Sequence, residues 1–245
     1  MPATDNNPLF NLWKGAKGVF QKKFLYDVFK TFIGVLLAFW VNEWKSSKQS
    51  DFTERTALHE IRKELDLNIL DLRDNLGGHR IGLESGRYFW KALHNQSVGE
   101  DTLMQVYNTL LRNFVSIQHS AAYESVKSRG LEIISDDSLR TQIANLFDFH
   151  LEVVEKLEEQ YAPHDFFQFY YHHFNEKLLP HIDISDRGKW TFAKPLSQMP
   201  EVDKTQFKMW LMRLMSDRQF MIAAYSDVES EMLRLRDAID VHLKK

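Results

Sequence analysis

Histidines and aspartates crowd one stretch in the second half of the chain. They are His164, Asp165, His172, His173, His181 and Asp183. Imidazole and carboxylate groups bind zinc and other divalent ions, so a metal-dependent enzyme built on His164, His172 and His173 is one alternative function. However, His164 and His172 lie about two helical turns apart, and no established ligand signature matches. We therefore favour surface or core histidines, and we expect no metal and no cofactor.

Aromatic side chains fill the same stretch, from position 161 to position 174. Such a group can line a pocket for an apolar ligand or a lipid. The candidate lining residues are Phe166, Phe167, Tyr170 and Tyr171. Aromatic rings also dominate protein cores, and core packing is the interpretation that we favour.

Other catalytic signatures are missing from the sequence. It holds no glycine-rich phosphate loop, no dinucleotide fingerprint, no serine-hydrolase elbow and no HExxH motif. It also has no cysteine, which excludes disulfides, thiolate catalysis and zinc–thiolate sites. The adjacent acids Glu158 and Glu159 have the pattern of a solvated surface. We therefore expect a protein that is not an enzyme.

The elements that carry these residues are predicted to be helices. Glycine (10) and proline (6) are scarce among 245 residues, which favours a few long helices over many short strands. The net charge of −3 provides no basic face for nucleic acid. The predicted fold class is all-α, with one N-terminal transmembrane helix that continues into an extramembrane helical bundle with a long C-terminal helix.

The transmembrane helix is predicted over residues 24–44, which read FLYDVFKTFIGVLLAFWVNEW. At about 1.5 Å per residue, its length approaches the thickness of the bilayer hydrocarbon. Its uncharged centre, residues 31–41, is short and would also suit a buried core helix. Residues 1–23 form a basic amphipathic segment that we expect in the headgroup layer. The residues expected at the membrane interface are Trp13, Lys22, Lys23, Tyr26, Lys30, Trp40 and Trp44.

Basic residues near the predicted span favour a cytoplasmic N-terminus. The N-terminal side carries Lys14, Lys17, Lys22, Lys23 and Lys30, and the C-terminal side carries Lys45, Lys48 and Arg55. Because the more positive flank usually stays in the cytoplasm, the domain of residues 45–245 is expected outside. In a Gram-negative bacterium, that compartment would be the periplasm.

Small and polar residues inside the span predict association between helices. Gly34 and Ala38 form a small-xxx-small pair, which lets two helix backbones approach closely in lipid. Asn42 could bond across the same interface or lie among headgroups. The expected partners are therefore membrane lipid and either further copies of the chain or other membrane proteins.

The domain of residues 45–245 is predicted to begin with an apolar helical seam. Its members are Leu58, Ile61, Leu65, Ile69, Leu72 and Leu76. Gly77 and Gly78 are expected to end this helix, and shorter helices are expected at residues 86–93, 101–114 and 121–129.

Two further helices are predicted in the C-terminal half. Ser135 is expected to cap the first, whose apolar face would consist of Leu139, Ile143, Leu146, His150, Val153 and Leu157. The second is the clearest element, because apolar residues keep a heptad rhythm from Phe207 to Ile239. Only Arg218 interrupts that rhythm.

Two segments resemble a family of uncharacterised bacterial single-span proteins, a domain-of-unknown-function group of similar length. Residues 33–44, IGVLLAFWVNEW, are similar to that family's span ending, which has an Ile-Gly pair, an alanine four residues after the glycine and an Asn-x-Trp. The second segment resembles a helix, a glycine and a capped helix of the family. It comprises Ala122-Tyr123-Glu124-Ser125, Gly130, Ile133-Ile134-Ser135-Asp136 and Leu139-Arg140. The resemblance implies membrane anchoring and a helical domain, and it implies no reaction.

Together these patterns predict a membrane-anchored helical interaction or accessory protein. It would self-associate or serve as a subunit of a larger membrane assembly.

Overall fold

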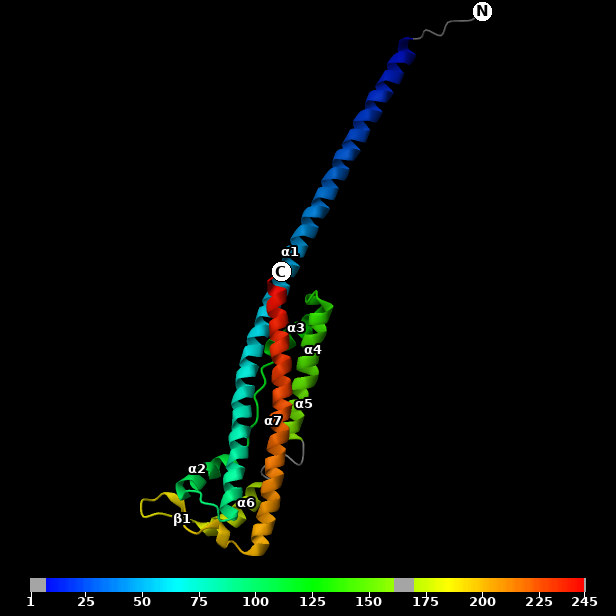
Figure 1. Ribbon diagram of the computed structural model, residues 1–245. Helices are drawn as coiled ribbons and strands as arrows, with labels where there is room; N and C mark the ends of the chain where they lie inside the picture. The colour runs from blue at the N-terminus through cyan, green and yellow to red at the C-terminus, as the bar shows by residue number, and fades with distance from the viewer. Residues whose placement is uncertain (1–7, 161–169, 245) are drawn as a thin grey trace, which may run out of the picture. The chain divides into compact units, whose positions relative to one another are not determined.

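The computed structural model describes residues 8–160 and 170–244, except for the side chains of residues 8–25, 27, 100 and 101. Helices make up 82% of the structure and strands 3%, which confirms the all-α class (Figure 1). Among the described residues, no helix offers a stretch that is long and apolar enough to cross a membrane. The transmembrane part of the predicted fold is therefore not supported.

Two long helices, α1 and α7, begin and end the described chain, and shorter helices and one hairpin lie between them in sequence. The elements are α1 (Pro8–Leu93), α2 (Glu100–Leu110), α3 (Ala121–Arg129), η1 (Leu131–Ile133), α4 (Asp137–Asn145), η2 (Leu146–Leu151), α5 (Glu152–Glu159), α6 (His172–Leu178), η5 (Leu179–His181), β1 (Ile182–Ile184), β2 (Trp190–Phe192), η6 (Leu196–Gln198) and α7 (Glu201–Leu243).

The chain divides into two compact units, Met1–Glu54 and Arg55–Lys245. In the first unit the described residues all belong to α1, and every described side chain from position 26 to position 52 is exposed. The second unit holds the remainder of α1 and all the other elements, and it contains the hydrophobic core.

Within the second unit, α1 and α7 run antiparallel and side by side (Figure 1). The Arg62 Nε donates to Asp240 Oδ1 at 2.5 Å, and the Arg73 Nε donates to Glu229 Oε1 at the same distance. From the first ion pair to the second, the residue number in α1 rises by 11, from 62 to 73. The residue number in α7 falls by 11, from 240 to 229, as expected for two antiparallel helices. The ion pairs therefore lie along one straight seam.

The predicted helix end at Gly77 and Gly78 is wrong, because α1 continues without a break to Leu93. The separate helix expected at residues 86–93 is accordingly the last part of α1. A glycine inside a helix costs about 1 kcal/mol relative to alanine, which packing on a neighbouring element can offset.

Three glycines, four residues apart, supply that packing. They are Gly78, Gly82 and Gly86. A Cβ on Gly78 would overlap the ring of Phe114. A Cβ on Gly82 would lie 2.5 Å from the Arg218 Cζ, and a Cβ on Gly86 would lie 2.7 Å from the Met215 Cγ. These glycines therefore let large side chains approach the α1 backbone.

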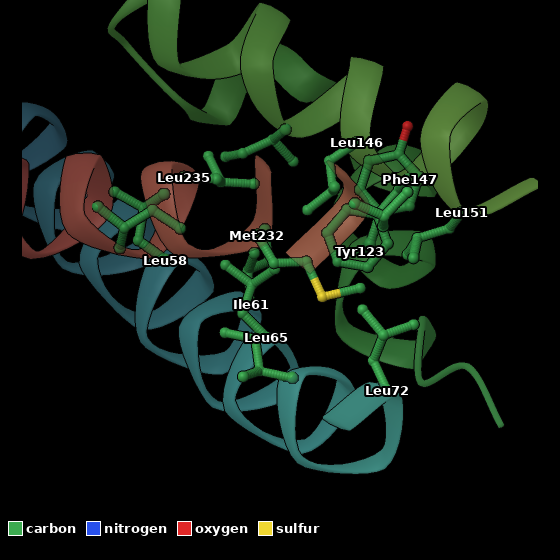
Figure 2. Packing of buried hydrophobic residues seen from close by; sticks show 14 of the residues in the cluster. Leu58, Ile61, Leu65, Leu72, Tyr123, Leu146, Phe147, Leu151, Met232 and Leu235 are labelled. Atoms are coloured by element: carbon green, nitrogen blue, oxygen red, sulfur yellow. The ribbon is translucent and has the colours of Figure 1, made fainter. Parts of the chain in front are cut away.

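The seam predicted on α1 is confirmed, because all six of its apolar residues are buried. Figure 2 shows Leu58, Ile61 and Leu65 turned toward Met232 and Leu235 of α7. Tyr123 of α3 and Phe147 of η2 close the other side, with their rings stacked at a centroid distance of 4.5 Å. This cluster forms the first of two hydrophobic cores.

The second core lies where α2, α6 and the start of α7 pack around the last turns of α1. It includes Phe89, Leu110, Tyr170, Phe174 and Phe207, all of which are almost fully buried. Between α6 and α7, β1 and β2 form a short antiparallel hairpin, which places Phe192 in this core.

The long C-terminal helix is confirmed as α7. Its buried residues follow the predicted heptad rhythm from Phe207 to Ile239, and the rhythm continues to Leu243. Arg218 does not interrupt the buried face, because its side chain is itself buried.

The helix after Ser135 differs from the prediction in two respects. Asp136, not Ser135, is the capping residue, since its carboxylate accepts from the Leu139 backbone N–H at 3.0 Å. The π-helical turn η2 then inserts one extra residue into the helical period. From this turn onward the buried positions are Phe147, Leu151, Val154 and Glu158. Of the predicted positions, Val153 is exposed and His150 is only half-buried, while Leu157 is half-buried and still packs against the first core.

Candidate functional site

The most exposed apolar surface in the described chain belongs to residues 26–44 of α1, here called the apolar segment. Phe39 is 72% exposed, Trp40 is 79% exposed and Trp44 is 66% exposed. Leu36 and Leu37, which precede them in the helix, are 50% and 58% exposed. In soluble monomers, contiguous exposed apolar surface is usually small, so this segment is the first candidate for a functional surface.

The residues predicted to associate lie within this segment, and all three are exposed: Gly34, Ala38 and Asn42. A Cβ placed on Gly34 would meet nothing within 4 Å. The glycine is therefore not required for packing inside the chain, unlike Gly78.

The predicted interface residues are only partly described. The Lys30 ammonium lies 4.3 Å above the ring of Tyr26, in a cation–π contact on one helix face. Trp40 and Trp44 are exposed toward the other end of the apolar segment. The side chains of Trp13, Lys22 and Lys23 lie outside the described residues, as do those of Phe24 and Leu25.

The histidine cluster is dispersed where the structure describes it. His173 stacks on Trp210 at a centroid distance of 4.5 Å, His172 is exposed, and His181 is buried near the Lys194 carbonyl. No group of three or more metal-ligating side chains occurs in the described part of the chain. His164 lies outside it.

The aromatic stretch is divided in the same way. Tyr170 is buried in the second core, and its hydroxyl donates to the carboxylate of Asp217. Tyr171 is 39% exposed. Phe166 and Phe167 lie outside the described residues, so the structure does not join the four candidates into one pocket.

A group of buried polar and aromatic side chains, here called the polar layer, lies beside the first core. It consists of His79, Phe114, Glu158, Arg218 and Tyr225. The His79 ring lies 5.5 Å from that of Phe114 and 5.3 Å from that of Tyr225. The Arg218 guanidinium lies 5.2 Å from the Phe114 ring, and the Tyr225 hydroxyl donates to Glu158.

Glu158 is the acidic member of the polar layer. Its Oε1 also accepts from Ser116, from the backbone N–H at 3.1 Å and from the hydroxyl at 2.8 Å. Burial raises the pKa of Glu158, although the three hydrogen bonds oppose that shift. Burial likewise raises the pKa of Tyr225, with a further contribution from the adjacent Glu158 charge.

Arg218 is the basic member, and backbone carbonyls accept hydrogen bonds from its Nη2. Its Nη2 donates to the carbonyls of Leu110 at 3.0 Å and Arg112 at 2.9 Å, at the end of α2. Burial lowers the pKa of Arg218 to about 10, so the guanidinium remains charged at neutral pH. The space for it comes from Gly82, which has no side chain to displace it.

The extended segment of residues 112–120 is held by a row of polar side chains on α1. Glu64, Asn68 and Asp71 lie on one helix face at spacings of four and three. Asp71 accepts from the Ile117 N–H at 2.7 Å, and Asn68 exchanges two hydrogen bonds with the backbone of His119. Glu64 accepts from the first N–H groups of α3, at Ala122 and Tyr123.

The polar layer therefore has a structural role. Glu158 accepts from Ser116, and Arg218 donates to the carbonyls of Leu110 and Arg112, so the two residues hold the end of α2 and the segment that follows it. The prediction that Glu158 is a solvated surface residue is wrong, because it is only 8% exposed. The π-helical turn η2 moved it onto the buried face, and no residue pattern in the sequence marked that turn.

Comparison with models of protein families, with curated proteins and with solved structures finds no match for this chain. The resemblance to single-span bacterial proteins therefore stays a prediction that rests on the two short segments quoted above.

Proposed function

We propose that this chain is a membrane-attached helical interaction protein, anchored by residues 24–44 and self-associating through that segment. The observation that carries the proposal is the exposure of the apolar segment, whose described side chains have no covering element within their own unit. Covering such side chains stabilises by roughly 25 cal/mol for each Å² removed from water.

Lipid fits the proposal because the apolar residues surround the helix rather than forming a single stripe. Val35, Leu36 and Leu37 are consecutive and are all about half exposed or more. A helix that is apolar all round suits a membrane or a large core, whereas a surface helix is apolar on one side. Residues 24–41 contain only two charged side chains, Asp27 and Lys30. At the usual rise they would extend roughly 27 Å, close to the hydrocarbon thickness.

Self-association is supported by the small residues on this helix. Gly34 and Ala38 are one turn apart, and the open space around Gly34 would accommodate the backbone of a second helix. Asn42 lies one turn further on, where an amide could bond to its counterpart.

Membrane attachment is tested by expressing the full chain and extracting its membranes with alkaline carbonate. The wild type should stay in the membrane pellet. Leu36→Arg with Leu37→Arg should move most of the protein to the supernatant, since each central arginine opposes insertion by about 2.5–3.5 kcal/mol. Leu70→Arg is the matched control, because Leu70 is also an exposed leucine of α1 but lies outside the apolar segment. A wild type that is released by carbonate would overturn the proposal.

Self-association is tested by light scattering of the full chain in detergent. Gly34→Ile with Ala38→Ile should convert an oligomer to a monomer. Gly77→Ile is the matched control, because a Cβ at Gly77 also meets nothing within 4 Å. A wild-type monomer, or an oligomer that survives the double substitution, would contradict association through this face.

A further inference from the structure

We propose that a groove between the end of α1 and the middle of α7 binds a single-chain anionic amphiphile, such as a long-chain carboxylate. The groove has a volume of about 530 Å³. The apolar surface of the groove is formed by Trp90, Met212 and Met215. Two cationic residues, Arg87 and Lys91, also line it. The site belongs to the second unit alone and does not depend on the proposed membrane attachment.

The apolar surface suits a flexible hydrocarbon chain. Met212 is 59% exposed in the groove, although it is a large apolar side chain. Methionine is unbranched and polarisable, so it adapts to chains of varied shape. Gly86 leaves room for the Met215 side chain that lines the groove. A Cβ at position 86 would lie 2.7 Å from the Met215 Cγ and would displace that side chain.

The polar surface suits an anion. Arg87 and Lys91 lie one turn apart on α1, and the Lys208 ammonium lies 6.0 Å from the Trp90 ring. The remaining lining residues are neutral, so no carboxylate faces the groove. The Arg87 guanidinium also contacts Glu84, but both side chains are more than half exposed, and an exposed ion pair contributes only about 0–1 kcal/mol. A bound carboxylate could therefore compete for it.

The size of the groove favours a small molecule over a protein partner. Sites for small molecules have volumes of about 300–1,000 Å³, which includes this one. A stable protein interface buries roughly 800 Å² on each side, which needs a far broader surface than eight lining residues supply.

The test uses the full-length protein with a long-chain fatty acid that carries a diazirine near its methyl end. After irradiation, mass spectrometry locates the attached label. We expect saturable labelling of residues 212–219 and 87–96. Arg87→Glu with Lys91→Glu should lower it at least fivefold, and so should replacing the probe by the corresponding neutral fatty alcohol.

Two matched variants separate specific binding from adhesion to apolar surface. Lys189→Glu changes an exposed lysine of the β1–β2 turn, and Met209→Asp changes an exposed methionine of α7 that does not line the groove; neither should alter labelling. Met212→Asp should reduce it as strongly as the charge reversal. Circular dichroism confirms that each variant is folded.

Three results would overturn the proposal. The first is label confined to residues 26–44, which would indicate adhesion to the apolar segment only. The second is equal labelling by acid and alcohol, which would remove the role of the cations. The third is saturable binding of an acidic amphipathic peptide to the groove without any fatty-acid labelling there, which would make it a protein-docking surface. None of these results bears on carbonate extraction, so this proposal and the proposed function fail independently.

Discussion

Two parts of helix α1 carry similar residues and have opposite environments. Leu36 and Leu37 are 50% and 58% exposed, whereas Leu58 and Leu65 are fully buried. The buried part has one apolar face, which α7 and the short helices cover, while the apolar segment is apolar all round. Among the described residues, each unit therefore treats its part of α1 differently: the second unit covers the apolar face, and the first unit leaves its apolar side chains exposed. For the other part, the proposed cover is lipid together with a second copy of the same segment.

The largest expected effect comes from truncating matched apolar residues in the two parts. Ile61→Ala should lower the free energy of unfolding by about 2–5 kcal/mol, because it opens a cavity in the first core. Leu36→Ala should change it by less than about 0.5 kcal/mol, since that side chain is 50% exposed. Urea denaturation followed by circular dichroism measures both. Equal losses would mean that the apolar segment is also covered by its own chain.

The next effect distinguishes two neighbouring glycines of α1. Gly78→Ala should destabilise by about 1–3 kcal/mol, because the new Cβ would overlap the Phe114 ring. Gly77→Ala should stabilise by roughly 0.5–1 kcal/mol, because its Cβ would enter open space in the middle of a helix. Thermal denaturation of the two variants should therefore shift the midpoint in opposite directions. Stabilisation by both would show that Phe114 does not pack against α1.

A smaller effect tests the polar layer through pH. The pKa of Glu158 is raised in the folded protein, so the native state binds this proton more tightly than the unfolded state does. The contribution of Glu158 to stability is therefore present below its unfolded pKa of about 4.5, and it declines as pH rises through the folded pKa. Relative to Glu158→Gln, the wild type should therefore lose stability over that window.

Denaturation curves collected from pH 4 to pH 8 measure this difference. Glu159→Gln is the control, because Glu159 is exposed and should leave the pH dependence of the wild type intact. A constant difference between wild type and Glu158→Gln would contradict the raised pKa.

The smallest effect is expected at the edge of the seam between α1 and α7. Arg73→Ala removes an ion pair with Glu229 in which the arginine side chain is 53% exposed. Such pairs contribute about 0–1 kcal/mol and weaken as salt screens them. Unfolding measured at low and high ionic strength should show a small loss that disappears with salt. A loss of 2 kcal/mol that persists in high salt would place this pair among the core interactions.

Much of the helical fold was predictable from residue periodicity. The seam from Leu58 to Leu76 and the rhythm from Phe207 to Ile239 were predicted, and both are buried as expected. Helix ends were less predictable. Glycine favours a helix end by its local conformational preference, but at Gly78 the packing of Phe114 outweighs that preference and the helix continues. Glu158 could not be placed, since one extra residue in the π-helical turn changes which face is buried.

The sequence by itself determined the helical class, the two long buried faces and the unusual apolar character of residues 26–44. These features depend on spacing along a single helix, which local geometry dictates. Only the tertiary structure decided that Gly78, Gly82 and Gly86 receive neighbouring side chains, that Glu158 and Arg218 are buried, and that Trp90 and Met212 share a groove. Each of these depends on which distant segments meet, and a polar or glycine residue is stable in such a place only when a specific partner lies opposite it.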